Sequence, residues 1–144
     1  MGKSKSGLSS LVALIFLGAV AAGAYMLLRD LNGPVVTVSP ETSRVGPTQD
    51  LTAHIVDPSG VRLVIVTVRR GPQSLVVLNQ EFDDKAPERD VTFNLKDAKL
   101  PEGAFDLEIK AYDGSYAGFG KGNSATLTLP MRLDSQPPRI AVKT

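Results

Sequence analysis

Beyond residue 34, hydrophobic and polar positions alternate with a period of two along most of the chain. The clearest case is the segment 104–112, in which Phe105, Leu107, Ile109 and Ala111 alternate with mostly charged residues. Successive side chains of a β-strand point to opposite faces, so this alternation predicts strands with one buried face. The same alternation, or a run of β-branched and apolar residues, marks seven segments: 35–38, 50–56, 61–70, 74–82, 91–95, 104–112 and 125–133.

Turn-forming residues separate these segments, and the richest of the intervening stretches is 113–123, "DGSYAGFGKGN". Seven short strands within about 100 residues, with no helical period between them, predict an all-β fold. We expect an Ig-like antiparallel β-sandwich of about seven strands over residues 34–133. The tryptophan and cysteines of antibody domains are absent from the sequence. Pro130 cannot donate a ladder hydrogen bond, so it predicts an edge position or a bulge in the last strand.

The N-terminal segment 8–28 follows a different pattern, with 21 consecutive residues that carry no charge. A helix of that length can cross a hydrocarbon core of about 30 Å. Lys3 and Lys5 precede it, so the positive-inside rule predicts a cytoplasmic tail at 1–7, a single transmembrane helix at 8–28 and the rest of the chain outside the cytoplasm.

A cleaved signal peptide is the alternative for this segment. Ala19-Val20-Ala21 and Ala22-Gly23-Ala24 both fit the small-x-small pattern of a cleavage site. The apolar run continues beyond them to Leu28, which a signal peptide does not need, and this favours an uncleaved anchor.

Two stretches of the chain echo one another without a gap. "DLNGPVVTV" (30–38) leads into the first predicted strand, and "DSQPPRIAV" (134–142) follows the last one at an offset of 104 residues. That offset is about the size of one small sandwich domain. We therefore interpret 134–144 as a linker and the first strand of a following domain. The alternative is that 139–142 forms a final strand of the first domain.

Charge and composition exclude several classes of site. From Asp30 onward the chain has 13 basic and 15 acidic residues, a formal balance of −2, which does not suit a nucleic-acid binder. We expect the basic cluster of Arg62, Arg69 and Arg70 to lie at solvated strand ends. With no cysteine and with His54 as the only histidine, a zinc site of three or four nitrogen or sulfur ligands cannot form. We expect His54 to be an exposed or half-exposed strand residue, and no cofactor is expected.

The glycine-rich stretch 113–123 holds the candidate partner contacts. Tyr116, Phe119 and Lys121 lie in a predicted hairpin loop between the last two strands, where exposed aromatic residues can contact a partner. The alternative is that the two aromatic rings fold back over the end of the core. Aspartates gather at the predicted turns, and we expect them to be solvated rather than to bind Ca²⁺; they are Asp57, Asp83, Asp84, Asp90 and Asp113.

The order of a short tail, an apolar anchor, an Ig-like domain with "DPSGVRLVIV" (57–66) and then "DSQPPRIAV" resembles the front of membrane-anchored envelope proteins of Gram-negative bacteria. More narrowly, it is similar to the N-terminal part of periplasmic peptidases of the M23 (lysostaphin-type) class. The zinc-binding His and Asp motifs of that family have no counterpart here, so no catalytic residue is implied.

The resemblance implies a single-pass protein of the inner membrane with its bulk in the periplasm. It also implies a non-catalytic spacer or presentation module, the front part of a cell-wall metallopeptidase, with peptidoglycan or another envelope protein as partner. The alternative is a stand-alone envelope module that binds a protein or glycan through the 113–123 loop. We do not expect an enzyme within these 144 residues.

Overall fold

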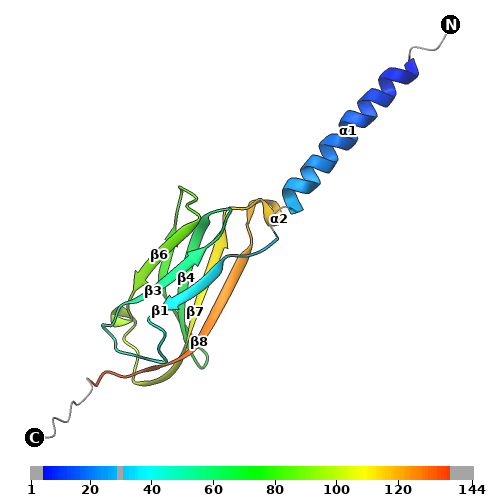
Figure 1. Ribbon diagram of the computed structural model, residues 1–144. Helices are drawn as coiled ribbons and strands as arrows, with labels where there is room; N and C mark the ends of the chain where they lie inside the picture. Colours follow the sequence, from blue (N-terminus) through cyan, green and yellow to red (C-terminus); the bar gives the residue numbers. More distant parts are fainter. Residues whose placement is uncertain (1–4, 29–30, 137–144) are drawn as a thin grey trace, which may run out of the picture.

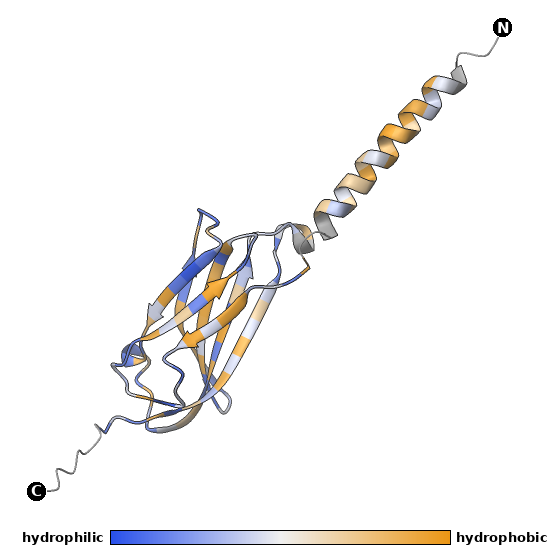
Figure 2. Cartoon of the chain, in the orientation of Figure 1, coloured by the Kyte–Doolittle hydropathy of each residue, from blue (hydrophilic) through white to orange (hydrophobic). Residues whose placement is uncertain are grey.

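The computed structural model describes residues 5–28 and 31–136, and it begins with one long helix. This helix, α1 (Lys5–Leu28), contains the stretch Gly7–Met26, which is long and apolar enough to cross a membrane. It extends as a single rod from one end of the β-domain (Figure 1), and apolar residues lie all around it (Figure 2). Its described side chains are exposed, so the β-domain does not cover this helix. An anchor and a signal peptide both form such a helix, so uncleaved anchoring stays a prediction.

Two β-sheets form the rest of the described chain. The smaller sheet has the strand order β1-β3-β6, and the larger has the order β2-β8-β7-β4-β5. All neighbouring strands are antiparallel except β2 and β8, which are parallel. The strands are β1 (Val35–Ser39), β2 (Arg44–Val45), β3 (Leu51–Val56), β4 (Val61–Arg70), β5 (Gln73–Glu81), β6 (Glu88–Phe93), β7 (Gly103–Asp113) and β8 (Ser124–Leu133). Two short helices interrupt the loops: η1 (Lys96–Ala98) and α2 (Ala117–Gly120).

The predicted all-β sandwich is confirmed, with one strand more than the period-two pattern indicated. All seven predicted strands form, while the additional strand β2 has only two residues, too few for any alternation to be seen. The buried residues occupy alternate positions on facing strands, as the pattern predicted. The apolar core includes Leu51, Ala53, Ile55, Val64, Val66, Val68, Val91, Phe93, Phe105, Leu107, Ile109, Ala111, Met131 and Leu133.

Strand β8 is an edge strand over most of its length. It pairs with β7 throughout but with β2 only at Arg132 and Leu133, so Pro130 stands on the free edge where its missing N–H costs no ladder bond. The prediction of an edge position is confirmed. Leu127 and Leu129 face inward as predicted but are only half-buried, because a groove of about 430 Å³ separates them from β1.

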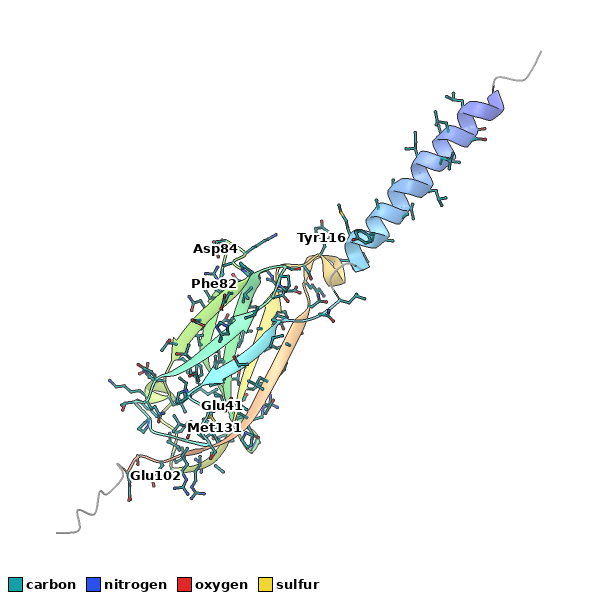
Figure 3. The ribbon with its side chains drawn as sticks, viewed as in Figure 1. Glu41, Phe82, Asp84, Glu102, Tyr116 and Met131 are labelled. Carbon is teal, nitrogen blue, oxygen red and sulfur yellow. The ribbon has the colours of Figure 1, made fainter. Side chains whose placement is uncertain are left out.

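The chain enters the sandwich at one end and leaves it at the other. At the entry, Asn123 donates from Nδ2 to the carbonyl of Asn32 at 3.2 Å. At the exit, the amide of Asp134 donates to the carbonyl of Val45 at 3.0 Å. Glu102 bonds to Ser135 beside that exit, far from Tyr116, which lies near α1 (Figure 3). The predicted strand at 139–142 lies outside the described residues.

Candidate interaction surface at the entry end of the sandwich

The loop between β7 and β8 carries the three candidate residues to the same end of the sandwich as α1. The side chain of Phe119 is 97% exposed and that of Tyr116 is 74% exposed, so neither ring folds back over the core. Phe119 has a backbone φ of 60°, in the left-handed region that a bulky residue rarely adopts. The loop that contains α2 therefore presents both aromatic rings to the outside. The fold-back alternative is wrong, and partner contact stays a prediction.

A buried carboxylate, Asp113, holds the two ends of this loop together. Its Oδ1 accepts hydrogen bonds from the amide of Ser115 at 3.0 Å, from the Ser115 hydroxyl at 2.7 Å and from the amide of Asn123 at 2.7 Å. Its Oδ2 accepts a bond from Asn123 Nδ2 at 2.9 Å. The aromatic residues thus project from a loop whose base is fixed by these bonds.

Basic side chains surround the base of the loop. Arg62 donates to the carbonyl of Lys121 at 2.8 Å, and its guanidinium lies 5.9 Å from the centre of the Tyr112 ring. The aliphatic part of Lys85 passes close to Gly114, and the side chains of Lys85 and Lys121 are exposed. The one carboxylate within the loop, Asp113, is buried. Within the loop the exposed charge is therefore that of Lys121, while Lys85 follows two exposed carboxylates, Asp83 and Asp84.

Two expectations about charged residues are corrected. Asp57 and Asp113 are not solvated but fully buried, since each accepts backbone amide bonds within its own turn, Asp57 from Ser59 at 2.8 Å. In the basic cluster of Arg62, Arg69 and Arg70, the first and last are half-buried rather than solvated. Arg70 donates to the carbonyls of Pro101 and Glu102 at 2.7 and 2.9 Å and so joins two loops of the exit end.

His54 lies on the outer face of the smaller sheet, half-exposed as predicted. Its Nδ1 is 2.5 Å from Asp90 Oδ1 and its Nε2 is 3.1 Å from Glu88 Oε1, both on the neighbouring strand β6. The hydrogen bond with Asp90 is the main cause of a raised pKa for His54; desolvation opposes it, and the charges of Asp90 and Glu88 raise the pKa further. Sequence reasoning missed this cluster, because His54 lies more than 30 residues from both carboxylates and meets them only through the register of β3 with β6.

This cluster does not have the geometry of a catalytic site. A catalytic histidine needs one ring nitrogen on a nucleophile or on substrate, and here both nitrogens contact carboxylates. Among the described residues no group of three or more His, Cys, Asp or Glu side chains is arranged to hold a metal ion. The groove between β1 and β8 is lined mainly by apolar and hydroxyl side chains, with Glu41 as its only charged residue.

The comparisons with known proteins do not show a family for this chain. No protein-family model and no curated protein matches the chain. Among solved structures, the fold is similar to one described as the crystal structure of an LPMO from Kitasatospora papulosa, with a TM-score of 0.48 and 11% sequence identity. The match covers 67% of this chain and 53% of that one, so the chain spans about half the length of that protein. A likeness at that level carries no argument about activity.

Proposed function

We propose that this chain is a membrane-tethered spacer that holds whatever follows residue 136 at a defined distance from the bilayer. The observation that supports the proposal is the placement of the two connections at opposite ends of an elongated sandwich (Figure 1). Strand β7, with 11 residues, runs the length of the sandwich, and at about 3.3 Å per residue it spans roughly 36 Å. A following segment would begin at about that height above the entry end.

The proposal places α1 in the inner membrane of a Gram-negative cell, with the N-terminus in the cytoplasm and the sandwich in the periplasm. Lys3 and Lys5 before the helix support that orientation. The resemblance to M23-type peptidases suggests that the following segment is a peptidoglycan hydrolase. On this proposal the sandwich would set the depth at which such an enzyme meets the cell wall.

The mass of the native protein is the first test. A membrane fraction is blotted with an antibody raised against residues 34–133. A band much larger than 15.3 kDa is expected, because the spacer needs a domain to present. A band at or just below that mass would overturn the spacer proposal, and the echo at 134–142 would then belong to the first sandwich.

Orientation is tested on the same cells. Protease added to spheroplasts should degrade the sandwich epitope, while a cytoplasmic protein stays intact. Protection of the epitope until the membrane is broken would place the sandwich in the cytoplasm and contradict the proposed topology.

The exposure of Tyr116 and Phe119 favours a second candidate function, a binding module for an envelope protein or glycan. The discriminating variant replaces both with serine in the full chain. A binding module should lose its co-sedimentation with isolated peptidoglycan or its co-purified envelope protein, whereas for a spacer neither should depend on these two side chains. The matched control is Val76→Ser, an exposed apolar residue on the edge strand β5.

A further inference from the structure

The connection between α1 and the sandwich is short. Leu28 ends the helix and Asn32 is already hydrogen-bonded to the sandwich, so only four residue steps separate them. An extended chain spans at most about 3.6 Å per residue, which limits that separation to about 14 Å. The apolar stretch of α1 ends at Met26, so the entry end of the sandwich must stay close to the surface of any bilayer that α1 crosses.

The end of that connection is attached directly to the base of the aromatic loop. Asn32 accepts its bond from Asn123, the residue that Asp113 also holds. The backbone of Gly33 packs so tightly against Ser124 that an added Cβ would lie 2.7 Å from the Ser124 carbonyl oxygen. The loop therefore cannot move away from the connection, and the same limit on distance from the bilayer applies to it.

The surface of the loop has the composition of a membrane-interface contact. Aromatic side chains are enriched at the level of the lipid headgroups, and a tyrosine can place its ring among acyl chains while its hydroxyl stays hydrated. Phe119 is almost fully exposed, most of Tyr116 is exposed, and the exposed charge within the loop is that of Lys121. Such a lysine suits the phosphates of anionic lipids. The headgroup layer is about 5–7 Å thick on each side of the bilayer, which is within reach of a loop so tethered.

We propose that the 113–123 loop is a second membrane contact, which places Tyr116 and Phe119 in the headgroup region of the bilayer that α1 crosses and so holds the sandwich upright. This inference rests on the proposed membrane tether. Lipid is favoured over a protein partner because the short connection keeps the loop against the bilayer and leaves little space for a folded domain between them.

The test uses the full chain reconstituted into vesicles of phosphatidylcholine and phosphatidylglycerol. The chain has no tryptophan, so Phe119→Trp supplies a single tryptophan in the loop, which can be excited selectively over the three tyrosines. Leu75→Trp is the matched control, an exposed apolar position on β5 close to the exit end. With lipids brominated near the glycerol, the Phe119→Trp protein should emit at shorter wavelength and lose most of its fluorescence. The Leu75→Trp protein should keep both its emission maximum and its intensity.

Equal, negligible quenching of the two proteins would overturn the inference. So would a blue-shifted emission from Phe119→Trp that lipid bromines do not quench, because that result indicates a protein contact instead. The tether itself is checked by flotation after an alkaline wash: loss of the chain from the vesicles overturns the proposed function, whereas retention without quenching overturns only the loop contact. If Phe119→Trp fails to fold by circular dichroism, Tyr116→Trp replaces it.

A second measurement follows the orientation of the sandwich. The chain has no cysteine, so Gln73→Cys accepts one donor fluorophore near the exit end, with acceptors on the lipid headgroups. Replacing Tyr116 and Phe119 with serine should raise the transfer efficiency, because a freed sandwich tilts toward the bilayer. Val76→Ser should leave it unchanged, and equal efficiencies in all three proteins would contradict a role for the loop in holding the domain upright.

Discussion

The two ends of the sandwich are built in opposite ways. At the entry end, a buried carboxylate binds the loop internally and two aromatic rings point outward. At the exit end, polar contacts lie near the surface: Arg70 donates to the carbonyls of Pro101 and Glu102, and Glu102 in turn bonds to Ser135. Within the described part of the sandwich, the aromatic side chains with the greatest exposure belong to the entry end.

In the entry loop, the residues that stabilise the fold are different from the residues that form the exposed surface. The entry loop does not depend on Tyr116 or Phe119 for its shape, because Asp113 supplies the bonds that close it. Exposed apolar rings that contribute little to folding are typical of a surface that contacts a membrane or another molecule. Near the exit end the exposed apolar residues are the aliphatic Leu75 and Val76, which are less exposed than the two rings.

The largest effect is expected from Asp113→Ala. Its loss leaves the amides of Ser115 and Asn123 without their buried acceptor, so the free energy of unfolding should fall by about 3 kcal/mol. Urea unfolding of the full chain in detergent micelles, followed by circular dichroism, measures it. The exit-end counterpart Glu102→Ala removes an exposed carboxylate and should change stability by no more than about 0.5 kcal/mol. Equal losses in the two variants would remove the contrast between the ends.

Two glycines of the entry loop should differ in their tolerance of a methyl group. Gly122 has φ of 79°, and an added Cβ would lie 2.5 Å from the Asp113 carbonyl oxygen, so Gly122→Ala should cost about 2–3 kcal/mol. Gly120 has φ of 92° but nothing within 4 Å of that Cβ, so Gly120→Ala should cost about 1 kcal/mol. The same urea titration compares them, and a larger loss at Gly120 would mean that contact with Asp113 does not close the loop.

Serine at both Tyr116 and Phe119 should leave folding nearly untouched. The two rings are exposed, so we expect the unfolding free energy to change by no more than about 0.5 kcal/mol. Thermal and urea unfolding in micelles check this. A loss of several times that size would show that the rings stabilise the loop itself, and their exposure would then need no external partner.

The smallest effect is expected at His54, on the smaller sheet away from either end. Its pKa in the folded chain is raised above 6.5, first by the hydrogen bond with Asp90 and then by the charges of Asp90 and Glu88. The stability that the charged ring adds is therefore complete below pH 6.5 and is lost as pH rises through the raised pKa. Urea midpoints of the parent should fall over that window, and those of His54→Gln should not. If the urea midpoints of the parent and of His54→Gln changed with pH in the same way, the pairing of His54 with Asp90 and Glu88 would be contradicted.

The sequence by itself determined where all the strands except β2 lie, and which face is buried in the strands that alternate most clearly. The alternation at 104–112 predicted the buried set Phe105, Leu107, Ile109 and Ala111, and the uncharged run at 8–28 predicted the helix. Pro130 likewise predicted an edge position or a bulge, and the structure has the edge position. These properties are local, because the period of side-chain direction and the lack of a proline N–H act within a few residues.

Only the tertiary structure decided which distant residues meet. Asp57 and Asp113 read as solvated turn residues in the sequence, yet both are buried, because neighbouring loops close over them and backbone amides replace water. Asp90 and Glu88 reach His54 through one particular strand register. The aromatic loop lies at the end of the sandwich where α1 joins because the order of strands brings Asn123 to Asn32, a contact across 91 residues that no local pattern encodes.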